Sequence, residues 1–279
     1  MGCRLAISPY LHNSGIQRAI LCALLVCFSA NVAHAGAWLQ PKGSGLFIAQ
    51  ISYFSSDYYF DVDGNKQKQS RFTKGEAQPY AEYGLAENIT IGGMLFAQSN
   101  QQNDHQKLGV ADPQIFARST IWKSGSQLIS LQPLIKLPSQ YRNKTTPRGG
   151  SSSTDYELSA LYGRNLDLVS NRDYLDLKIG YRVRNGQLND QYHADAMVGL
   201  GIDDNWHIIP AIRATFATKM NDQRFSQNGD LDYDLVKLEL AANYQFTATR
   251  SFSISLANHV WGRQTGDGYG ASVGFAQKF

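Results

Sequence analysis

Cysteine is nearly missing from this sequence, and the 3 copies present, Cys3, Cys22 and Cys27, all lie near the start. A protein from which that start is removed would have no thiol, which excludes a disulfide framework and a thiolate metal site. Long hydrophobic runs are scarce too, since the mean hydropathy is -0.33 and the longest apolar stretch lies within residues 19–30. That stretch is too short for a transmembrane helix, which needs about 20 apolar residues.

Net charge is small as well. The 26 Lys and Arg residues nearly balance the 23 Asp and Glu residues, so the net charge is +3 at pH 7. Residues 1–35 contain two bases, Arg4 and Arg18, and no acid, so the 244 residues that follow (279 − 35) carry about +1 (3 − 2). A chain this close to neutrality lacks the basic surface that binds nucleic acid, and we expect no nucleic-acid partner.

The first 35 residues are typical of a secretory signal peptide. A basic start is followed by the apolar run, and Ala33-His34-Ala35 supplies the small-x-small pattern of a cleavage site. We therefore predict that residues 1–35 form a signal peptide cleaved after Ala35. Residues 36–279 are then predicted to form a single domain.

What the chain does contain is alternation of apolar and polar residues. Near the C-terminus, Val273 and Phe275 lie on one face of an extended strand, and Ser272 and Gly274 lie on the other. The same period of two recurs in twelve segments, which predicts twelve strands. These segments are 45–58, 71–85, 88–98, 110–122, 127–138, 154–165, 173–184, 191–202, 206–219, 231–246, 250–263 and 268–279.

The predicted connections alternate between short turns and longer loops. A transmembrane barrel with an even strand number places short turns in the periplasm and long loops outside. We therefore predict an all-β fold, a transmembrane up-and-down antiparallel β-barrel of about 12 strands. A soluble β-sandwich is the alternative, but it gives no reason for sorted connections. The longer predicted loops are 59–70, 99–109, 139–153, 185–190, 220–230 and 264–267.

The alternation also assigns the two faces of each strand. Leu175, Leu177 and Ile179 alternate with charged residues, so the apolar set faces lipid and the charged set faces the lumen. Two interpretations of such a lumen stay open: a network of ion pairs that fills it, or a constriction that selects small polar solutes. The predicted lumen-lining residues are Glu76, Glu82, Asp112, Arg118, Lys136, Asp155, Glu157, Asp176, Lys178, Arg182, Arg184, Asp195, Arg213, Lys237, Glu239 and Arg263.

Basic residues gather in two of the predicted external loops. Contact with lipopolysaccharide phosphates would account for them. The alternative is an electropositive mouth that attracts anionic solutes or acidic polysaccharide. The candidates are Lys66, Lys68, Arg71, Lys74, Arg142, Lys144 and Arg148.

Several segments resemble known outer-membrane proteins. The final strand, which ends on Phe279, resembles the C-terminal strand that Gram-negative barrels present to their assembly machinery. The run from Glu82 to Gly92 resembles the strand-turn-strand signature of small barrels described as transporter-like or linked to phenol degradation. The start Gly36-Ala37-Trp38 is similar to that of XagA-like proteins, some of which are associated with extracellular polysaccharide loci. This resemblance implies an outer-membrane barrel and leaves the transported substrate open.

No enzyme is predicted. An outer-membrane phospholipase needs a His followed two residues later by Ser, and no His in residues 36–279 has this pattern. An omptin-like protease needs its acidic pair and its Asp-His pair at the same mouth. Here Asp104-His105 lies in a predicted external loop and Asp203-Asp204 in a predicted periplasmic turn. We also expect no cofactor and no metal.

The sequence thus predicts an outer-membrane β-barrel of a Gram-negative bacterium, a passive channel or transport-associated protein for small polar solutes. The alternative is a closed structural or accessory barrel linked to cell-surface polysaccharide or adhesion. The expected partners are outer-membrane lipid, lipopolysaccharide and the barrel-assembly machinery. We expect a monomer or a small homo-oligomer.

Overall fold

The computed structural model describes residues 36–138, 153–186, 188–220 and 232–279. Their regular secondary structure consists of twelve β-strands. The strands are β1 (Gly45–Phe60), β2 (Lys66–Ala86), β3 (Ile89–Gln102), β4 (His105–Ser124), β5 (Gln127–Lys136), β6 (Asp155–Leu166), β7 (Asp173–Arg184), β8 (Gln191–Gly201), β9 (Trp206–Ala217), β10 (Asp234–Thr247), β11 (Arg250–Arg263) and β12 (Thr265–Lys278).

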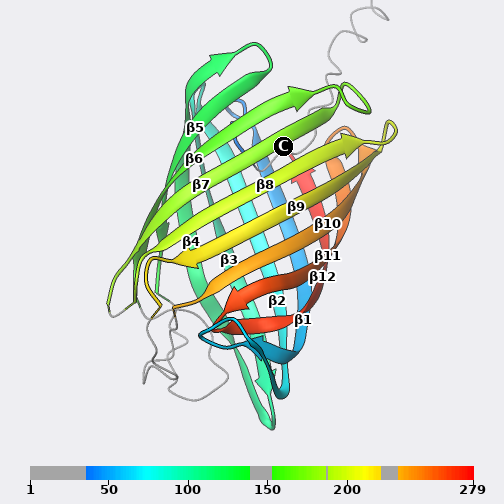
Figure 1. Cartoon of the computed structure of the whole chain (residues 1–279). Helices are drawn as coiled ribbons and strands as arrows, with labels where there is room; N and C mark the ends of the chain where they lie inside the picture. The colour runs from blue at the N-terminus through cyan, green and yellow to red at the C-terminus, as the bar shows by residue number, and fades with distance from the viewer. Residues whose placement is uncertain (1–35, 139–152, 187, 221–231) are drawn as a thin grey trace, which may run out of the picture. The chain divides into compact units, whose positions relative to one another are not determined.

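The strands form a closed antiparallel barrel (Figure 1). Each strand pairs with the next along the chain, and β12 pairs with β1, with Leu46 opposite Lys278 and Ile51 opposite Val273. Closure leaves no free sheet edge, which in an open sheet would expose unpaired backbone groups. The predicted fold class, an antiparallel all-β barrel of twelve strands, is confirmed. No helix in the described part of the chain is long and apolar enough to span a membrane.

Burial in this barrel is reversed relative to a soluble domain. Ile179, Leu256 and Tyr269 are 66%, 63% and 71% exposed on the outer face. In contrast, Glu157 and Asp155 are 3% and 0% exposed on the inner face. The outer face is therefore apolar, as a lipid environment requires, and the polar groups find their partners inside.

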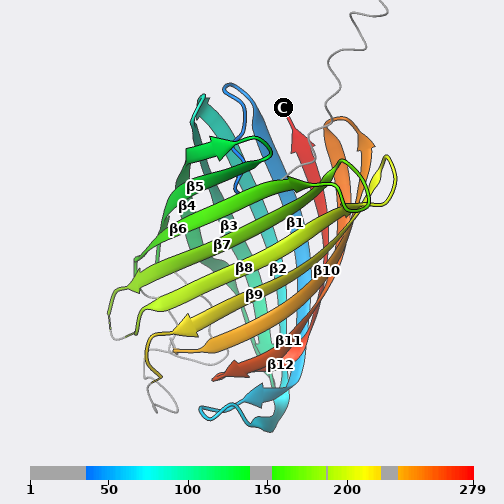
Figure 2. The same cartoon turned by 45° about the horizontal axis from the view of Figure 1, so that its top comes forward.

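Both ends of the domain lie at one end of the barrel, which we call the terminal end (Figure 2). Gly45 N–H donates to the Phe279 carbonyl at 2.7 Å, and Phe279 N–H donates to the Gly45 carbonyl at 3.0 Å. The connections 87–88, 125–126, 167–172, 202–205 and 248–249 lie at this same end. The opposite end, which we call the far end, carries the β1–β2, β3–β4 and β11–β12 hairpins.

Three of the predicted external loops, 59–70, 99–109 and 264–267, are wrong. Residues 59–70 and 99–109 belong mostly to long hairpins, which turn at 61–65 and at 103–104. The β11–β12 connection is Gln264 alone. The strict alternation of short and long connections therefore does not hold. A strand that projects beyond the apolar outer surface needs no lipid-facing residues. It therefore lacks the alternation of apolar and polar residues that predicts a strand.

The β1–β2 hairpin turns on an Asp-Gly pair. The Asp61 side chain accepts hydrogen bonds from the Asp63 and Asn65 backbone N–H groups at 3.0 and 2.8 Å, and from the Gln67 side chain at 2.9 Å. The hydrogen bond from Gln67 and those from the two backbone groups hold the pKa of Asp61 below its ordinary value. Gly64 has a φ of 84°, which glycine adopts without strain.

Candidate functional site

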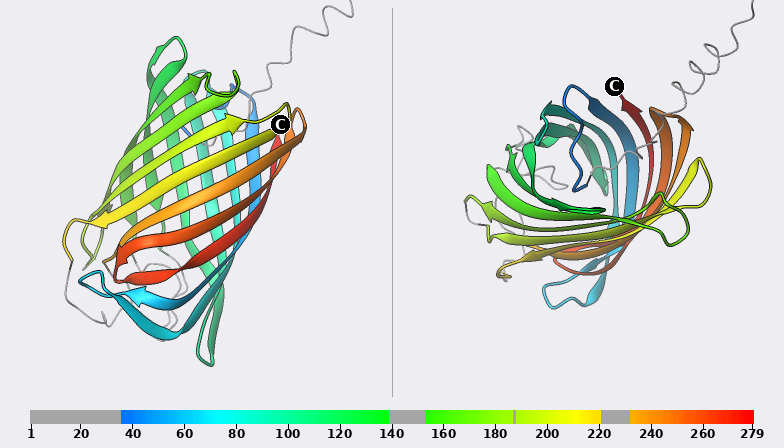
Figure 3. Two further views of the ribbon diagram at one scale, coloured as in Figure 1. Left: turned by 45° about the vertical axis from the view of Figure 1, so that its right-hand side comes forward. Right: turned by 90° about the horizontal axis from the view of Figure 1, so that it is seen from above.

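The chain that precedes β1 turns into the ring of strands at the terminal end (Figure 3, right). We call residues 36–44 the N-terminal segment. Ala37 N–H donates to Asp176 Oδ2 at 3.0 Å, and the Ala37 carbonyl accepts from Ser130 Oγ at 2.7 Å. The Trp38 carbonyl accepts from Arg118 at 2.9 Å. Side chains of three different strands thus hold two successive residues inside the lumen.

The next residues of the segment are bound by β2 and β3. Gln40 N–H donates to Thr90 Oγ1 at 2.8 Å, and its side-chain amide donates to Glu82 Oε1 at 2.8 Å. Lys42 forms an isolated parallel bridge with Gly84. A Cβ on Gly84 would lie 2.0 Å from the Pro41 carbonyl oxygen, so glycine is needed for this close approach.

Trp38 anchors the segment by packing. Its ring meets that of Tyr174 edge-on, with centroids 5.9 Å apart. Trp38 also packs against a buried cluster of Ala37, Leu128 and Leu161. A Cβ on Gly163 would lie 2.9 Å from the Trp38 ring, so this inward glycine makes room for the indole. The terminal end therefore contains a small apolar core inside an otherwise polar lumen.

A buried ion pair lies against the segment. Arg118 lies 3.2 Å from Glu82, and their side chains are 3% and 0% exposed. Arg118 also donates to Gln132 Oε1 at 2.9 Å. Each charge is therefore paired and hydrogen-bonded, which such depth requires.

A second cluster is centred on Glu157 in the wall formed by β6, β7 and β8. Its carboxylate lies 2.8 Å from Lys178 Nζ and 2.6 Å from Arg182, and His193 Nε2 lies 3.9 Å away. Ser159 Oγ donates to it at 2.7 Å. One fully buried carboxylate thus pairs with two neighbouring cations on β7.

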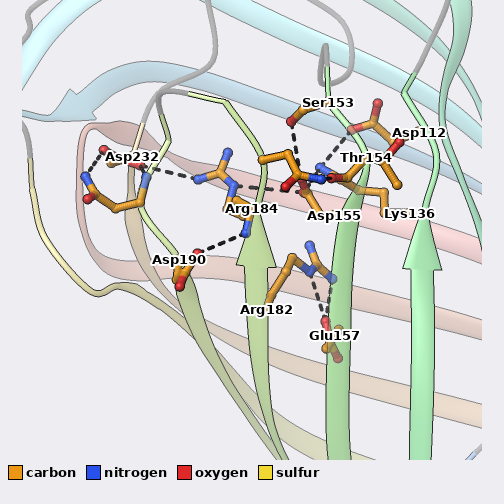
Figure 4. Close-up of polar contacts among 12 residues, drawn as sticks. Asp112, Lys136, Ser153, Thr154, Asp155, Glu157, Arg182, Arg184, Asp190 and Asp232 are labelled. Atoms are coloured by element: carbon orange, nitrogen blue, oxygen red, sulfur yellow. Dashed lines mark hydrogen bonds and ion pairs between the residues drawn. The ribbon is translucent and has the colours of Figure 1, made fainter.

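A third cluster lies toward the far end (Figure 4). Lys136 Nζ lies 2.5 Å from Asp155 and 3.4 Å from Asp112. Arg184 lies between Asp155 at 3.9 Å and Asp232 at 3.4 Å. The pairs link β4, β5, β6 and β7 to the residues before β10, so they tie the far-end wall together.

Five further predicted lumen charges, Asp195, Arg213, Lys237, Glu239 and Arg263, form pairs on β8 to β11. Arg213 lies 3.7 Å from Asp195 and 3.4 Å from Glu239, and Lys237 lies 3.1 Å from Glu239. Arg263 pairs with Asp234. These groups are more exposed than Glu157, since the Glu239 and Arg213 side chains are 18% and 36% exposed.

An open cavity of about 490 Å³ lies along the opposite wall. Ser255, Ala257, Gly270 and Ser272 line it from β11 and β12, and these small side chains leave the space free. Lys74, Glu76, Lys237 and Glu239 also line it, and each acid among them has a base within 3.3 Å. The cavity is therefore polar and close to neutral.

Aromatic rings close one side of this cavity. Phe54 stacks on His259 with ring centroids 4.6 Å apart, and Phe72 lies 6.4 Å from Phe54. All three rings line the cavity together with Gln50, Gln78 and Gln102. The space offers amide and hydroxyl groups beside an apolar surface, so it can hold a small polar molecule.

Comparison with solved structures finds barrels of the same fold. It is similar to an outer membrane channel from Pseudomonas putida F1, with a TM-score of 0.72 and 14% identity over 89% of this chain and 100% of the other. It is also similar to the NanC porin (TM-score 0.52, 11% identity, 83% and 100% covered). The KdgM porin, solved with disordered oligogalacturonate, has a TM-score of 0.52 at 9% identity, with 84% and 99% covered. At such identities the likeness establishes the fold. No family model and no curated protein matches the sequence.

Of the four predicted basic contact residues that the structure describes, three pair with acids. Lys66 Nζ lies 2.5 Å from Asp267, and Arg71 lies 2.9 Å from Asp57. Lys74 pairs with Glu76 at 3.3 Å and lines the lumen cavity. Lys68 is exposed on β2. The other three candidates, Arg142, Lys144 and Arg148, lie outside the described residues.

Sequence reasoning missed the residues that hold the N-terminal segment. Thr90 and Ser130 give no signal in the sequence, because a lone hydroxyl on a strand carries no pattern. Trp38 was noted only as part of a resemblance. A signal was present in Gly84 and Gly163, two inward glycines in strands that have no need for them unless another backbone or ring approaches. Among the described residues, no group of three or more His, Cys, Asp or Glu could hold a metal.

Proposed function

We propose that this protein is an outer-membrane barrel of a Gram-negative bacterium that passes small polar solutes passively. The observation that carries the proposal is the polar cavity of about 490 Å³ along β11 and β12. It lies inside a barrel whose outer face exposes apolar side chains, as a protein surrounded by lipid requires. The likeness to a channel and two porins supports it. The proposal involves no catalytic step.

The charge pattern argues for weak ion selectivity. Glu76 and Glu239 face the cavity, each beside a lysine, so neither sign of charge dominates the path. A neutral polar solute fits such a lining better than an ion does. The N-terminal segment restricts the terminal end, so the open state is narrow.

Planar-bilayer recording of the purified protein tests this proposal. We expect small single-channel currents with little preference between potassium and chloride. Glu76→Lys should add charge of one sign to the cavity wall and shift the preference toward chloride, whereas Asp112→Asn, beyond the cavity, should leave it unchanged. Absence of any current through correctly folded barrels would contradict the channel proposal.

A closed accessory barrel is the second candidate. The observation that favours it is the extent of filling: the Glu157 cluster and the N-terminal segment occupy the lumen from both the wall and the terminal end. The resemblance of the mature start to XagA-like proteins suggests a link to surface polysaccharide. Silent barrels in the bilayer experiment would favour this role.

Removal of Phe279 should impair assembly. Its backbone exchanges two hydrogen bonds with Gly45 across the β1–β12 seam, and its position is that of an assembly signal. We expect several-fold less heat-modifiable barrel in outer-membrane fractions of the deletion variant. Phe279→Tyr, which keeps the backbone and an aromatic ring, is the control. Wild-type abundance of the deletion variant would contradict both the seam and the signal.

Contacts with lipopolysaccharide are proposed for the far end. Lys68 and Arg71 are exposed on the projecting β1–β2 hairpin, where phosphate groups of the outer leaflet would lie. The pairing of Arg71 with Asp57 reduces the net charge there, so it argues against an anion-attracting mouth on this hairpin.

A further inference from the structure

One predicted lumen acid forms no ion pair with Lys or Arg among the residues that the structure describes. Seven of the eight predicted lumen acids form ion pairs with Lys or Arg within the described residues. The eighth, Asp176, forms none, although it is only 4% exposed. An unpaired carboxylate at this depth is costly, so a cation is expected beside it.

The group that lies against Asp176 is the start of the predicted mature chain. Ala37 N–H donates to its Oδ2 at 3.0 Å. Gly36 lies so close that a Cβ there would be 1.3 Å from the same oxygen. The Gly36 nitrogen shares a Cα with that Cβ position, so it lies at most about 4 Å from the carboxylate.

We infer that cleavage after Ala35 creates the missing partner: the new α-ammonium group of Gly36 pairs with Asp176 and locks the N-terminal segment in the lumen. Before cleavage the Gly36 nitrogen is a neutral amide and cannot compensate the carboxylate charge. After cleavage it carries a positive charge and three donors at the position where the lumen lacks them. Glycine at the first position lets the carboxylate lie this close, because any side chain there would displace it.

This contact between the Gly36 ammonium and Asp176, which we call the latch, therefore couples removal of the signal peptide to fixing of the N-terminal segment in the lumen. Arg118, Ser130 and Thr90 hold the segment whether or not it is cleaved, since they bind its backbone. The Asp176 contact alone changes its charge state on cleavage. An exported barrel would thus gain its last lumen contact only after the signal peptide has been removed.

Chemical labelling of the processed protein tests the latch without reference to conduction. Full-length precursors are expressed, and the mature barrels are purified from outer membranes, weighed intact and treated with an N-terminus-selective aldehyde. We expect a mass that starts at Gly36 and slow labelling of the wild type. Asp176→Asn should react about tenfold faster, as expected for the loss of one charge-assisted hydrogen bond.

Two further variants make the test specific. Asp195→Asn is the matched control, because it removes a neighbouring lumen acid that pairs with Arg213 and not with the segment. Insertion of one Ser between Ala35 and Gly36 moves the ammonium away while Asp176 stays, and it should label as fast as Asp176→Asn. This variant keeps the inference testable if Asp176→Asn fails to assemble. A mature chain that starts at another residue, or equal labelling rates for wild type and both variants, would overturn it.

Discussion

Deleting residues 37–42 should raise the single-channel conductance several-fold. These residues occupy the cross-section of the terminal end, where Ala37 is fully buried and Trp38 packs on Tyr174. A twelve-stranded barrel leaves little space beside such a segment. The barrel wall itself should survive, because the β1–β12 seam starts at Gly45. Planar-bilayer recording of the deletion variant beside the wild type measures the effect.

A replacement of equal length distinguishes two effects of the N-terminal segment: the volume that it occupies and the contacts that hold it in place. When Trp38-Leu39-Gln40 becomes Gly-Ser-Gly, the backbone remains but the contacts with Tyr174 and Glu82 are lost. We expect intermediate, flickering currents, because the segment is retained and only part of its hold is removed. If the deletion conducts like the wild type, the solute path does not pass the segment.

Replacing Glu157 with Gln should destabilise the folded barrel by about 3–5 kcal/mol, the range found when one partner of a buried ion pair is removed. The carboxylate is 0% exposed and pairs with both Lys178 and Arg182. Without it the two cations face each other on β7 beside His193. Urea unfolding in lipid vesicles measures the free energy of unfolding.

Glu239→Gln is the matched control for this prediction. Glu239 also lies between two cations, Arg213 at 3.4 Å and Lys237 at 3.1 Å, but its side chain is 18% exposed. Water can solvate those cations when the carboxylate is lost, so we expect a cost of at most about 1 kcal/mol. Equal losses for the two variants would show that burial does not decide the strength of these pairs.

The apolar parts of the strands were predictable, and their polar extensions were not. Residues 173–184 and 250–263 were placed correctly to the residue, because both strands alternate throughout their length. β2 and β4 begin at Lys66 and His105, five residues before the predicted 71 and 110. The first extension is polar on both faces and the second has Leu108 as its one large apolar residue, so neither alternates. Local sequence cannot distinguish them from loop, and pairing within the hairpin decides their structure.

The lumen also has predictable and unpredictable features. Alternation points Glu157 and Arg182 to the same face, because inward and outward positions follow the strand period. Which charges meet depends on the register between strands, such as Glu157 opposite Arg182. The asymmetry between a charged wall and an open wall also follows from register, because it brings Ser255 of β11 beside Ser272 of β12.

The sequence by itself determined the number of strands and the alternation of side chains between two faces. Both follow from a period of two, which is a local property of the chain. Only the tertiary structure decided that the N-terminal segment enters the lumen and that Asp176 lies against Ala37. The hydrogen bond between Ala37 and Asp176 joins residues 139 positions apart, and no local pattern encodes that distance. It exists because the barrel closes and brings the inner face of β7 against the chain that precedes β1.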